Sequence, residues 1–502
     1  MTYPFNNFYE MLENSAKEHG SAPAIFIDDD KVSYKEFLQK VDKTASYLQN
    51  IGIKKGDKVA LILPNCEEFV ITTFATTAIG AVIVPLNAQL KTKEYEYILQ
   101  NAQVRLLVTS QKLKEIKELK SEFKIYVDGE EGALFANILN TNEIKFEKHL
   151  TKLDELAVLI YTSGTTGKPK GVMLSYKNIF SNIIAGSELF QLSKKDRFIV
   201  YLPMSHAFSF SIMVMLPFYK ASAIVIMRSI LPFSNIIKQV LLKRVTIFLG
   251  VPDVYNSLIK AKLPWYFRWF NSIRIFISGA SALSEDTLER FKKKFSHASM
   301  LEGYGLSECS PAVAINPLNK ARALSVGLPL GETEVKVVND ELVELAHGEA
   351  GELIVKGDCV MMGYYGHEES TKETIINGWL KTGDIAKVDE DGYIYIVDRI
   401  KDLIISKGVN IYPREIEEVL HLHEQIKISA VLGKSDQNSG EVPVAFVELE
   451  DGSTLSELEI KKYLKEHLAN FKVPKSIIFK DELPKNATGK VLKRVLKEEA
   501  QL

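Results

Sequence analysis

Short apolar runs alternate with helix-like segments over most of the first 330 residues of the chain. The runs at 59–63, 81–86 and 105–109 are typical of buried strands, and the stretch at 67–79 between the first two is helix-like. Strands that alternate with helices usually form parallel sheets with helices packed on their faces. The pattern therefore predicts a layered α/β fold with largely parallel sheets.

The pattern changes twice further along the chain. From about Gly331, short alternating strands such as 334–338 and 351–355 indicate a small β subdomain. A second change, near 398–402, leads into an α+β region that is rich in charge. In that region we expect helices at 413–421 and 455–468, and strands at 426–432 and 442–448. We therefore predict a large N-terminal domain over 1–398 and a small C-terminal domain over 402–502.

The composition narrows the class of protein. A chain of 502 residues is too long for a single compact core and should divide into domains. Its 46% apolar and 25% charged residues are typical of a globular protein, and a net charge of −2 gives no sign of a nucleic-acid partner. The three cysteines, Cys66, Cys309 and Cys359, have no paired spacing, so we expect reduced thiols and no disulfide or zinc framework.

No apolar segment has the character of a membrane span or a secretion signal. The first residues lack a charged start followed by an apolar core. The longest apolar stretch, at 212–227, is interrupted by Pro217 and Lys220 and is too short to cross a bilayer. The default expectation is a soluble enzyme of the cytoplasm.

The segment at 161–171 carries the most specific chemistry. It follows an apolar run at 156–160 and combines three glycines and two lysines with several hydroxyl side chains. Glycines allow a tight turn that brings backbone N–H groups to a ligand, and ammonium groups add charge, so the segment suits an anionic oligophosphate. The spacing excludes a Walker A loop, because only two residues separate Gly164 from Gly167 and Pro169 follows Lys168. The alternative is a polar surface turn between two strands.

Four further segments occur in a fixed order with this loop, at 304–308, 381–384, 398–402 with 406–408, and 484–490. Together the five resemble the adenylate-forming (ANL) superfamily, and within it the fatty-acyl-CoA ligases, over nearly the whole chain. The resemblance implies a two-step reaction. A carboxylate first joins the α-phosphate of ATP with Mg²⁺ present and pyrophosphate leaves, and the thiol of coenzyme A then displaces AMP.

The resemblance also assigns the nucleotide site. The phosphate loop would comprise Thr162, Ser163, Gly164, Thr165, Thr166, Gly167, Lys168 and Lys170. The base would lie against Gly279, Ala280 and Ser281, with Tyr304 stacked on it, unless Tyr304 is simply packed in the core. Ser307 stands where the family usually has Thr, and its hydroxyl should keep the polar contact.

Charged residues complete this implied site. Asp384 would bind the ribose hydroxyls, the alternative being a turn residue after Gly383. Arg399 would reach the ribose or phosphates, the alternative being an interdomain salt bridge. Glu308 would bind Mg²⁺, the alternative being a solvated surface charge.

Lys490 would enter the site for adenylation and bridge the acyl carboxylate and the phosphate. The C-terminal domain would then rotate about a hinge over 399–401, centred on Lys401. Rotation would replace the Lys490 loop by the segment 403–409, whose Lys407 and Gly408 would line the path of the coenzyme A arm. His206 would lie near the acyl carboxylate, as a general base or as a packing or gating residue.

The acyl pocket is the least defined part. The apolar segments 207–218 and 250–252 suit a medium or long alkyl chain, although Asp253 stands where the family more often has Thr. The aromatic segment Trp265–Phe270 could face a membrane as an acyl portal, but ordinary packing is the stronger reading. The alternatives for function are an acyl–acyl-carrier-protein ligase, a CoA ligase for an aromatic or other acid, and a non-catalytic nucleotide or lipid binder.

Overall fold

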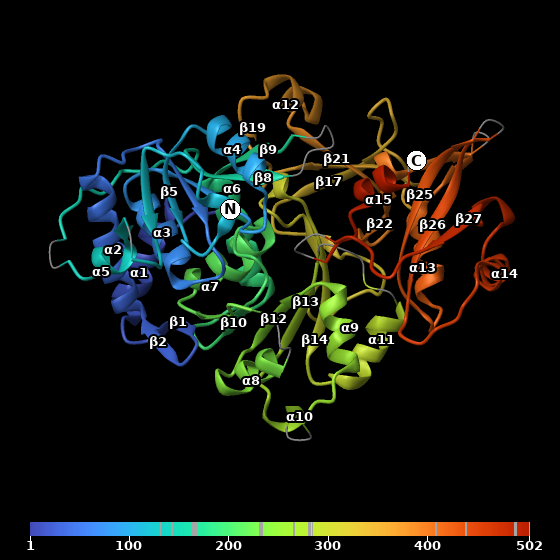
Figure 1. Ribbon diagram of the computed structural model, residues 1–502, viewed down its shortest axis with the longest axis horizontal. Helices are drawn as coiled ribbons and strands as arrows, with labels where there is room; N and C mark the ends of the chain where they lie inside the picture. Colours follow the sequence, from blue (N-terminus) through green and yellow to red (C-terminus); the bar gives the residue numbers. More distant parts are fainter. Residues whose placement is uncertain are drawn as a thin grey trace.

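The computed structural model describes residues 1–130, 132–141, 144–162, 168–229, 234–264, 267–279, 283, 285–406, 409–436, 439–485 and 489–500. Strands and helices alternate through the N-terminal part, and the C-terminal part forms a separate lobe beside it, coloured orange to red in Figure 1. The expected α/β fold with a small α+β C-terminal unit is confirmed.

Two large sheets form the N-terminal part. The nine-stranded sheet runs β16 (Leu328–Pro329), β15 (Ala314–Ile315), β14 (Ser299–Tyr304), β13 (Ile275–Ser278), β12 (Ile247–Gly250), β10 (Arg197–Val200), β11 (Ala223–Ile226), β1 (Pro23–Ile27) and β2 (Asp30–Ser33). Its inner strands, from β14 to β1, pair in parallel, and antiparallel strands close both edges.

The eight-stranded sheet runs β19 (Gly363–Tyr364), β9 (Lys170–Ser175), β8 (Leu156–Thr162), β4 (Val82–Leu86), β3 (Lys58–Ile62), β5 (Val104–Thr109), β6 (Phe123–Tyr126) and β7 (Ala133–Leu134). Here too the inner pairs are parallel, whereas β8–β9 and β9–β19 are antiparallel. The strands expected at 59–63, 81–86, 105–109 and 156–160 are thus all present, within two residues of the predicted bounds.

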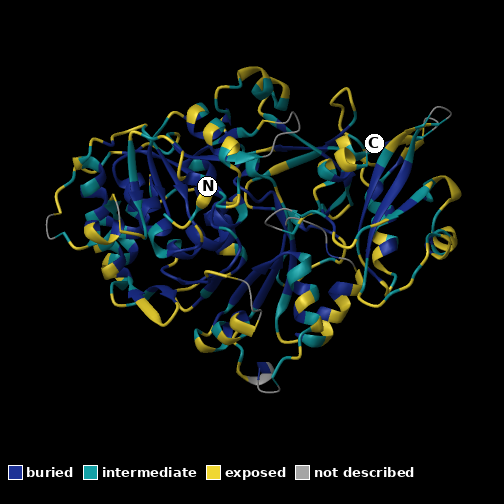
Figure 2. Cartoon of the chain, viewed as in Figure 1, coloured by how far each residue is buried: buried dark blue, intermediate teal, exposed yellow. Residues whose placement is uncertain are grey.

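Helices cover both sheets and fill the space between them. The longer ones are α1 (Phe8–His19), α2 (Tyr34–Asn50), α3 (Glu67–Ala78), α4 (Thr92–Asn101), α6 (Tyr176–Leu189), α8 (Ser234–Leu242), α9 (Pro252–Lys260) and α11 (Glu285–Lys294). Ser33 and Ser175 cap α2 and α6, each accepting from the backbone of the third helical residue, whose side chain returns the bond. One hydrophobic core joins both sheets through α3 and α6, and Figure 2 shows these inner strands and helices as buried.

The N-terminal part contains shorter helical pieces as well. They are α5 (Phe135–Leu139), a π-helical turn (Ser209–Met215), α7 (Leu216–Tyr219), α10 (Phe267–Phe270) and α12 (Glu368–Thr374). The apolar stretch at 212–227 thus divides among the π-helical turn, α7 and strand β11. None of the helices in the described part of the chain is both long and apolar enough to cross a bilayer.

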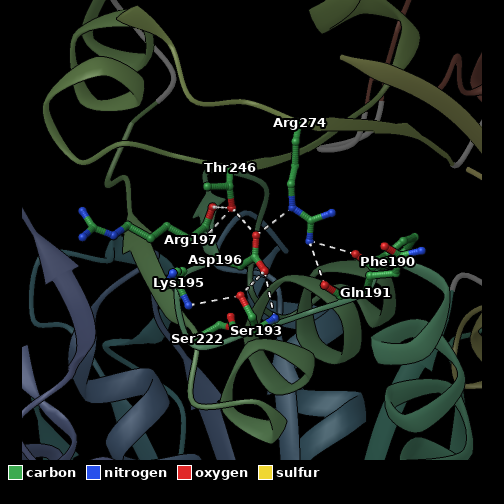
Figure 3. A network of polar contacts seen from close by, with 9 residues as sticks. All are labelled: Phe190, Gln191, Ser193, Lys195, Asp196, Arg197, Ser222, Thr246 and Arg274. Carbon is green, nitrogen blue, oxygen red and sulfur yellow. Dashed lines mark hydrogen bonds and ion pairs between the residues drawn. The ribbon is translucent and has the colours of Figure 1, made fainter. Parts of the chain in front are cut away.

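A buried polar network fastens the amino-terminal edge of the nine-stranded sheet (Figure 3). Asp196, just before β10, accepts from Thr246, just before β12, at 2.9 Å and from Arg274, just before β13, at 2.9 Å. Arg274 also donates to the carbonyl of Phe190 at the end of α6, at 2.8 Å. Burial alone would raise the pKa of Asp196, but Arg274 and the Ser193 amide together hold it below its usual range.

An antiparallel β subdomain completes the N-terminal part, and the C-terminal lobe follows it with a core of its own. The subdomain contains β17 (Glu334–Val338), β18 (Gly351–Lys356), β20 (Ile375–Ile376), β21 (Trp379–Val388) and β22 (Ile394–Arg399). After β22, a sheet of β23 (Ile404–Ser406), β24 (Val409–Ile411), β25 (Ile426–Asp436), β26 (Gly440–Leu449) and β27 (Ser476–Phe479) packs with α13 (Pro413–His421), α14 (Glu457–His467) and α15 (Lys493–Glu499). The helix expected at 413–421 is α13 to the residue.

Candidate active site

The predicted site residues gather at the carboxyl ends of strands. Thr162 ends β8, Gly279 follows β13, Tyr304 ends β14, and His206 lies six residues beyond β10. In open α/β sheets, ligands bind at this edge. The sheet topology therefore brings together residues that are far apart in the sequence.

Asp384 is the centre of a hydrogen-bonded triad. Its Oδ2 accepts from the Tyr304 hydroxyl at 2.6 Å, and its Oδ1 lies 2.9 Å from Arg399 Nε. Asp384 and Arg399 face each other in the β21–β22 ladder, and Asp384 is only 3% exposed. Asp384 is thus a strand residue and not a turn residue, and Arg399 pairs within its own sheet and not between domains.

Burial and the interactions within this triad set the protonation states of Tyr304 and Arg399. Burial, followed by the neighbouring Asp384, raises the pKa of Tyr304 well above its ordinary value, so its hydroxyl stays a donor. Burial alone would lower the pKa of Arg399, but Asp384 and other nearby anionic groups raise it overall. Each carboxylate oxygen has two lone pairs, so Asp384 keeps acceptor capacity for further hydroxyls.

Glu308 lies in a short 3₁₀ turn (Ser307–Cys309) and is partly buried. Its Oε1 accepts from the Tyr364 hydroxyl at 2.9 Å, and its carbonyl accepts from the Met361 amide at 2.8 Å. Glu308 is therefore held in place and is not a freely solvated charge. Tyr364 was not singled out from the sequence, because nothing local marks a tyrosine in a short strand 56 residues away as a partner of Glu308.

The phosphate loop is described at its two ends. Thr162 and Lys170 face each other where β8 and β9 diverge, so the loop does connect two antiparallel strands. Lys170 Nζ donates to Ser370 Oγ at 2.9 Å and lies 5.2 Å from the centre of the Tyr364 ring, while Lys168 Nζ lies 5.5 Å from the Tyr97 ring centre. The predicted residues Ser163, Gly164, Thr165, Thr166 and Gly167 lie outside the described residues.

Gly279 is buried directly against an aromatic ring. A Cβ built on Gly279 would lie 3.4 Å from Phe208 Cζ, so a larger residue there would press on the Phe208 ring. The other two predicted purine-lining residues, Ala280 and Ser281, lie outside the described residues. Beyond them the Leu283 amide donates to Glu302 Oε1 at 3.0 Å, an anchor that sequence reasoning missed.

Glu302 is a buried carboxyl two residues before Tyr304. It lies opposite Ser278 in the parallel β13–β14 pair and is 7% exposed. Burial raises the pKa of Glu302 to about 7, although its bond to the Leu283 amide and the charge of Arg414 oppose the shift. The group therefore titrates near neutral pH.

His206 begins the helical segment that follows β10. Its carbonyl accepts from the Phe210 amide at 2.8 Å, and its ring is exposed. Exclusion of water by the surrounding protein nevertheless lowers the pKa of His206, so the imidazole is largely neutral at pH 7. Whether this imidazole is a base or a gate stays a prediction.

Lys490 reaches the triad from the C-terminal lobe. Its pKa is lowered to about 8, first because the surrounding protein displaces water and then because Arg399 repels it, while Asp384 and Asp402 act in the opposite direction. These electrostatic partners place the Lys490 ammonium in the neighbourhood of Asp384 and Arg399. The preceding Gly489 has φ +81°, a left-handed conformation that favours glycine.

The segment assigned to the hinge joins β22 to β23. Lys401 is exposed in a 3₁₀ turn (Ile400–Asp402), and the hairpin β23–β24 follows at once. Ile405 and Val409 on this hairpin are 52% and 47% exposed. The predicted residues Lys407 and Gly408 lie outside the described residues.

The aromatic segment before β13 divides between core and surface. Phe267 is 2% exposed and packs edge-on against Phe295, with ring centres 6.5 Å apart, whereas Phe270 is 69% exposed. Trp265 and Tyr266 lie outside the described residues. Ordinary packing thus accounts for Phe267 and leaves Phe270 at the surface.

Comparison with known proteins decides the family. The model of the AMP-binding enzyme family matches residues 12–365, and that of the AMP-binding enzyme C-terminal domain matches residues 415–490. The chain is 33% identical to the long-chain-fatty-acid–CoA ligase of Bacillus subtilis (strain 168), over 99% of this chain and 95% of that protein. The chain belongs to the AMP-binding enzyme family.

The names of other relatives refer to different acid substrates. The chain is 34% identical to a feruloyl-CoA synthase of Amycolatopsis sp over 92% of both proteins. The ATP-bound crystal structure of MatB from Rhodopseudomonas palustris, 30% identical over 99% of both chains, superposes with a TM-score of 0.91, and the apo structure of MatB with 0.80. Within the family, the chain is an AMP-forming acid–CoA ligase, which uses ATP with Mg²⁺ and takes coenzyme A as a substrate.

The residues present fit a magnesium ion that is held mainly by phosphates. The described residues contain no group of three or more potential metal ligands, so a metal here would rely on one carboxylate and on the nucleotide. Glu308 offers that carboxylate, with one oxygen oriented by Tyr364.

Proposed function

We propose that this acid–CoA ligase activates a medium- or long-chain fatty acid as an acyl-adenylate and transfers the acyl group to coenzyme A. The observation that carries the proposal is the approach of Lys490 to the triad of Tyr304, Asp384 and Arg399. A binding protein would need the triad but not a lysine brought to it from the other domain.

The nucleotide would lie across the carboxyl edge of the nine-stranded sheet. Its base would pack on Tyr304 and the backbone at Gly279, and its ribose hydroxyls would donate to Asp384 while Arg399 holds that carboxylate. The segment from Thr162 to Lys170 would hold the outer phosphates. Glu308 would hold Mg²⁺, which when bound supplies positive charge to the polyphosphate.

Lys490 would promote the first step. The attacking carboxylate and the α-phosphate are both anionic, and an ammonium between them offsets their repulsion as the new C–O–P linkage forms and pyrophosphate leaves. With a pKa of about 8, Lys490 is mostly protonated at pH 7, as this role requires. In the second step the coenzyme A thiol must lose a proton, and the neutral His206 ring is a candidate acceptor.

The two steps would use two positions of the C-terminal domain, with Lys401 as the hinge. The exposed Ile405 and Val409 support this proposal, because an apolar hairpin at the surface would gain burial by turning into the site. The closer similarity to ATP-bound MatB than to apo MatB is consistent with an arrangement poised for adenylation.

The apolar residues Val251 and Pro252, which follow Gly250, favour an alkyl chain. Adjacent to Gly250, Tyr201 donates its hydroxyl to the Leu249 carbonyl at 2.7 Å, and Tyr255 donates to the Ile277 carbonyl at 2.6 Å. Both hydroxyls are thus committed to backbone carbonyls. A CoA ligase for an aromatic acid is the second candidate, favoured by the similarity to a feruloyl-CoA synthase.

A panel of acids tests the proposal. Pyrophosphate release would be measured with acids from acetate to oleate and with ferulate, and the products would then be identified with coenzyme A or acyl carrier protein as acceptor. We expect the highest kcat/KM for a medium or long alkyl acid with coenzyme A. A preference for ferulate would establish the second candidate, transfer to carrier protein alone would establish a carrier-protein ligase, and no pyrophosphate with any acid would refute all three.

Peripheral membrane contact is a separate part of the proposal, for a protein that otherwise resides in the cytoplasm. The exposed Phe270, together with the 61% exposed Leu242 at the end of the adjacent α8, supports it. Phe270→Ser should then reduce co-sedimentation with anionic lipid vesicles, and unchanged co-sedimentation would refute contact at this point.

A further inference from the structure

Helix α9 contacts the C-terminal domain at both of its ends. At the first turn, Asp253 Oδ2 lies 3.8 Å from Lys485 Nζ. At the last turn, Lys260 Nζ lies 2.5 Å from Glu450 Oε1. In Figure 1, α9 and the neighbouring α11 face the orange and red C-terminal domain.

The contact at Asp253 also includes the backbone of the catalytic loop. A Cβ built on Gly489 would lie 3.2 Å from Asp253 Oδ2 and 3.8 Å from Val251 Cγ2, so Gly489 lies directly against the start of α9. Lys485 and Gly489 flank the stretch that carries Lys490 to the triad. Asp253 therefore lies close to Lys485 and Gly489, whereas the charges that act on Lys490 include those of Arg399 and Asp384.

The helix supports this arrangement. Asp253 is the second residue of α9, whose N-cap residue, Val251, makes no side-chain capping bond. An acidic residue in the first turn is stabilised by the helix dipole. The carboxylate is thus held at the end of a rigid element with its charge available to the C-terminal domain.

We propose that Asp253 is a positioning residue for adenylation: it holds the Lys485–Lys490 loop in the site, and the Lys260–Glu450 ion pair steadies the same docked position from the far end of α9. The inference rests on the proposed function, since it deepens the role given to Lys490. Asp253 is not a catalytic residue here, because it acts through the loop and not on the reacting atoms.

The proposal predicts an asymmetric loss between the two half-reactions. An exposed ion pair contributes about 0.2–1 kcal/mol, so Asp253→Asn should slow pyrophosphate exchange by roughly three-fold. The reaction of supplied acyl-adenylate with coenzyme A should stay unchanged or become faster, because leaving the docked position becomes easier. Asp286→Asn is the matched control, since Asp286 is also in a first turn, on α11, and pairs only with Arg290 of its own helix among the described residues.

Exchanging the charges of Asp253 and Lys485 tests whether their ion pair contributes to adenylation. Asp253→Lys should slow pyrophosphate exchange more than Asp253→Asn, and adding Lys485→Asp should restore at least half of the lost rate. Equal loss in both half-reactions, or no recovery in the double variant, would overturn the proposal. A raised KM for the acid alone would also overturn it, because that result would place Asp253 in the acyl pocket.

A cross-linking experiment distinguishes failure of the positioning role of Asp253 from failure of the proposed function. Lys260→Cys with Glu450→Cys would be joined by a short bismaleimide, while the native cysteines are buried. The cross-linked protein should keep pyrophosphate exchange and lose transfer to coenzyme A, and Asp253→Asn should lower the cross-linking yield. If no acid supports pyrophosphate exchange in the wild-type protein, the proposed function fails, whereas a yield that is insensitive to Asp253→Asn refutes the positioning role alone.

Discussion

The hydroxyl of Tyr304 lies 2.6 Å from Asp384 Oδ2, so the residue assigned to the adenine also orients the carboxylate assigned to the ribose. The two residues are 80 positions apart and come from different sheets. One side chain would thus fix the distance between the two ends of the proposed nucleoside site.

Tyr304→Phe should separate these two roles. The variant keeps the ring for stacking but removes a hydrogen bond to a charged group, a bond that contributes about 1.5–3 kcal/mol. We expect the KM for ATP to rise by roughly ten-fold or more, with a smaller change in kcat, as measured by pyrophosphate release. Tyr393→Phe, which removes a hydroxyl bonded to the Lys320 carbonyl away from the site, is the control. A normal KM for ATP in Tyr304→Phe would contradict the ribose assignment of Asp384.

Replacement of Lys490 should slow adenylation but not the transfer to coenzyme A. Lys490→Ala removes the ammonium from the adenylation site, so pyrophosphate exchange should fall at least about a hundred-fold, in keeping with loss of a preorganised electrostatic group. Transfer from supplied acyl-adenylate to coenzyme A should remain near the wild-type rate. Lys480→Ala, whose lysine pairs with Glu499 on the surface, should change neither rate. Similar losses in both half-reactions would argue against the assignment.

The pH dependence of adenylation should reflect the ionisation of Lys490. Because the pKa of Lys490 is lowered to about 8, its charge is present below that pH and is lost above it. The rate of pyrophosphate exchange should therefore decline as pH rises through about 8. In Lys490→Arg the residual rate should show no such decline, since a guanidinium stays charged. A decline at the same pH in this variant would assign the titration to another group.

Lys401→Pro should slow transfer to coenzyme A far more than adenylation, because proline restricts the backbone rotation that the hinge requires. Rapid-quench measurement of each half-reaction gives the comparison. Lys401→Ala removes the same side chain without restricting the backbone and should leave both rates near normal. Equal slowing of both half-reactions in Lys401→Pro would refute a hinge at this residue.

Glu302 should make the protein less stable as pH rises. Its folded pKa of about 7 lies above the usual 4.5, so the folded state binds more protons than the unfolded state between these two values. The free energy of unfolding should therefore fall from pH 4.5 to 7 and level off above that. Glu302→Gln should remove this dependence and raise the free energy of unfolding at pH 8 by up to about 3 kcal/mol. Urea unfolding at pH 5 and pH 8 checks this, with Glu285→Gln on the exposed turn of α11 as the control.

Local pattern was sufficient to predict many of the strands and helices. Apolar runs predicted β3, β4, β5 and β8, and charge with periodicity predicted α13, because each signal lies within the element itself. Asp384 and Lys490 were assigned through the family resemblance of the segments in which they lie, and their roles stay predictions. The sequence pattern did not identify the side chains that contact these residues in the folded protein.

The missed residues are all partners across the fold. The side chains of Tyr364 and Glu302 make long-range hydrogen bonds, to Glu308 and from the Leu283 amide, and neither residue stands in a sequence context that marks it. Asp253 stood out only as a departure from the family, and its contact with Lys485 depends on how the C-terminal domain docks. Such relationships arise from tertiary packing, which a single sequence does not encode locally.

The network around Asp196 has a consequence for how this enzyme can diversify. It fastens the loops before β10, β12 and β13 to α6 at the edge of the sheet opposite to Tyr304 and Gly279. The contacts of this network therefore lie apart from the residues proposed to meet substrates. Substitutions at the carboxyl edge that change the accepted acid would leave these contacts in place, so the loops at the opposite edge need not be rebuilt for each new specificity.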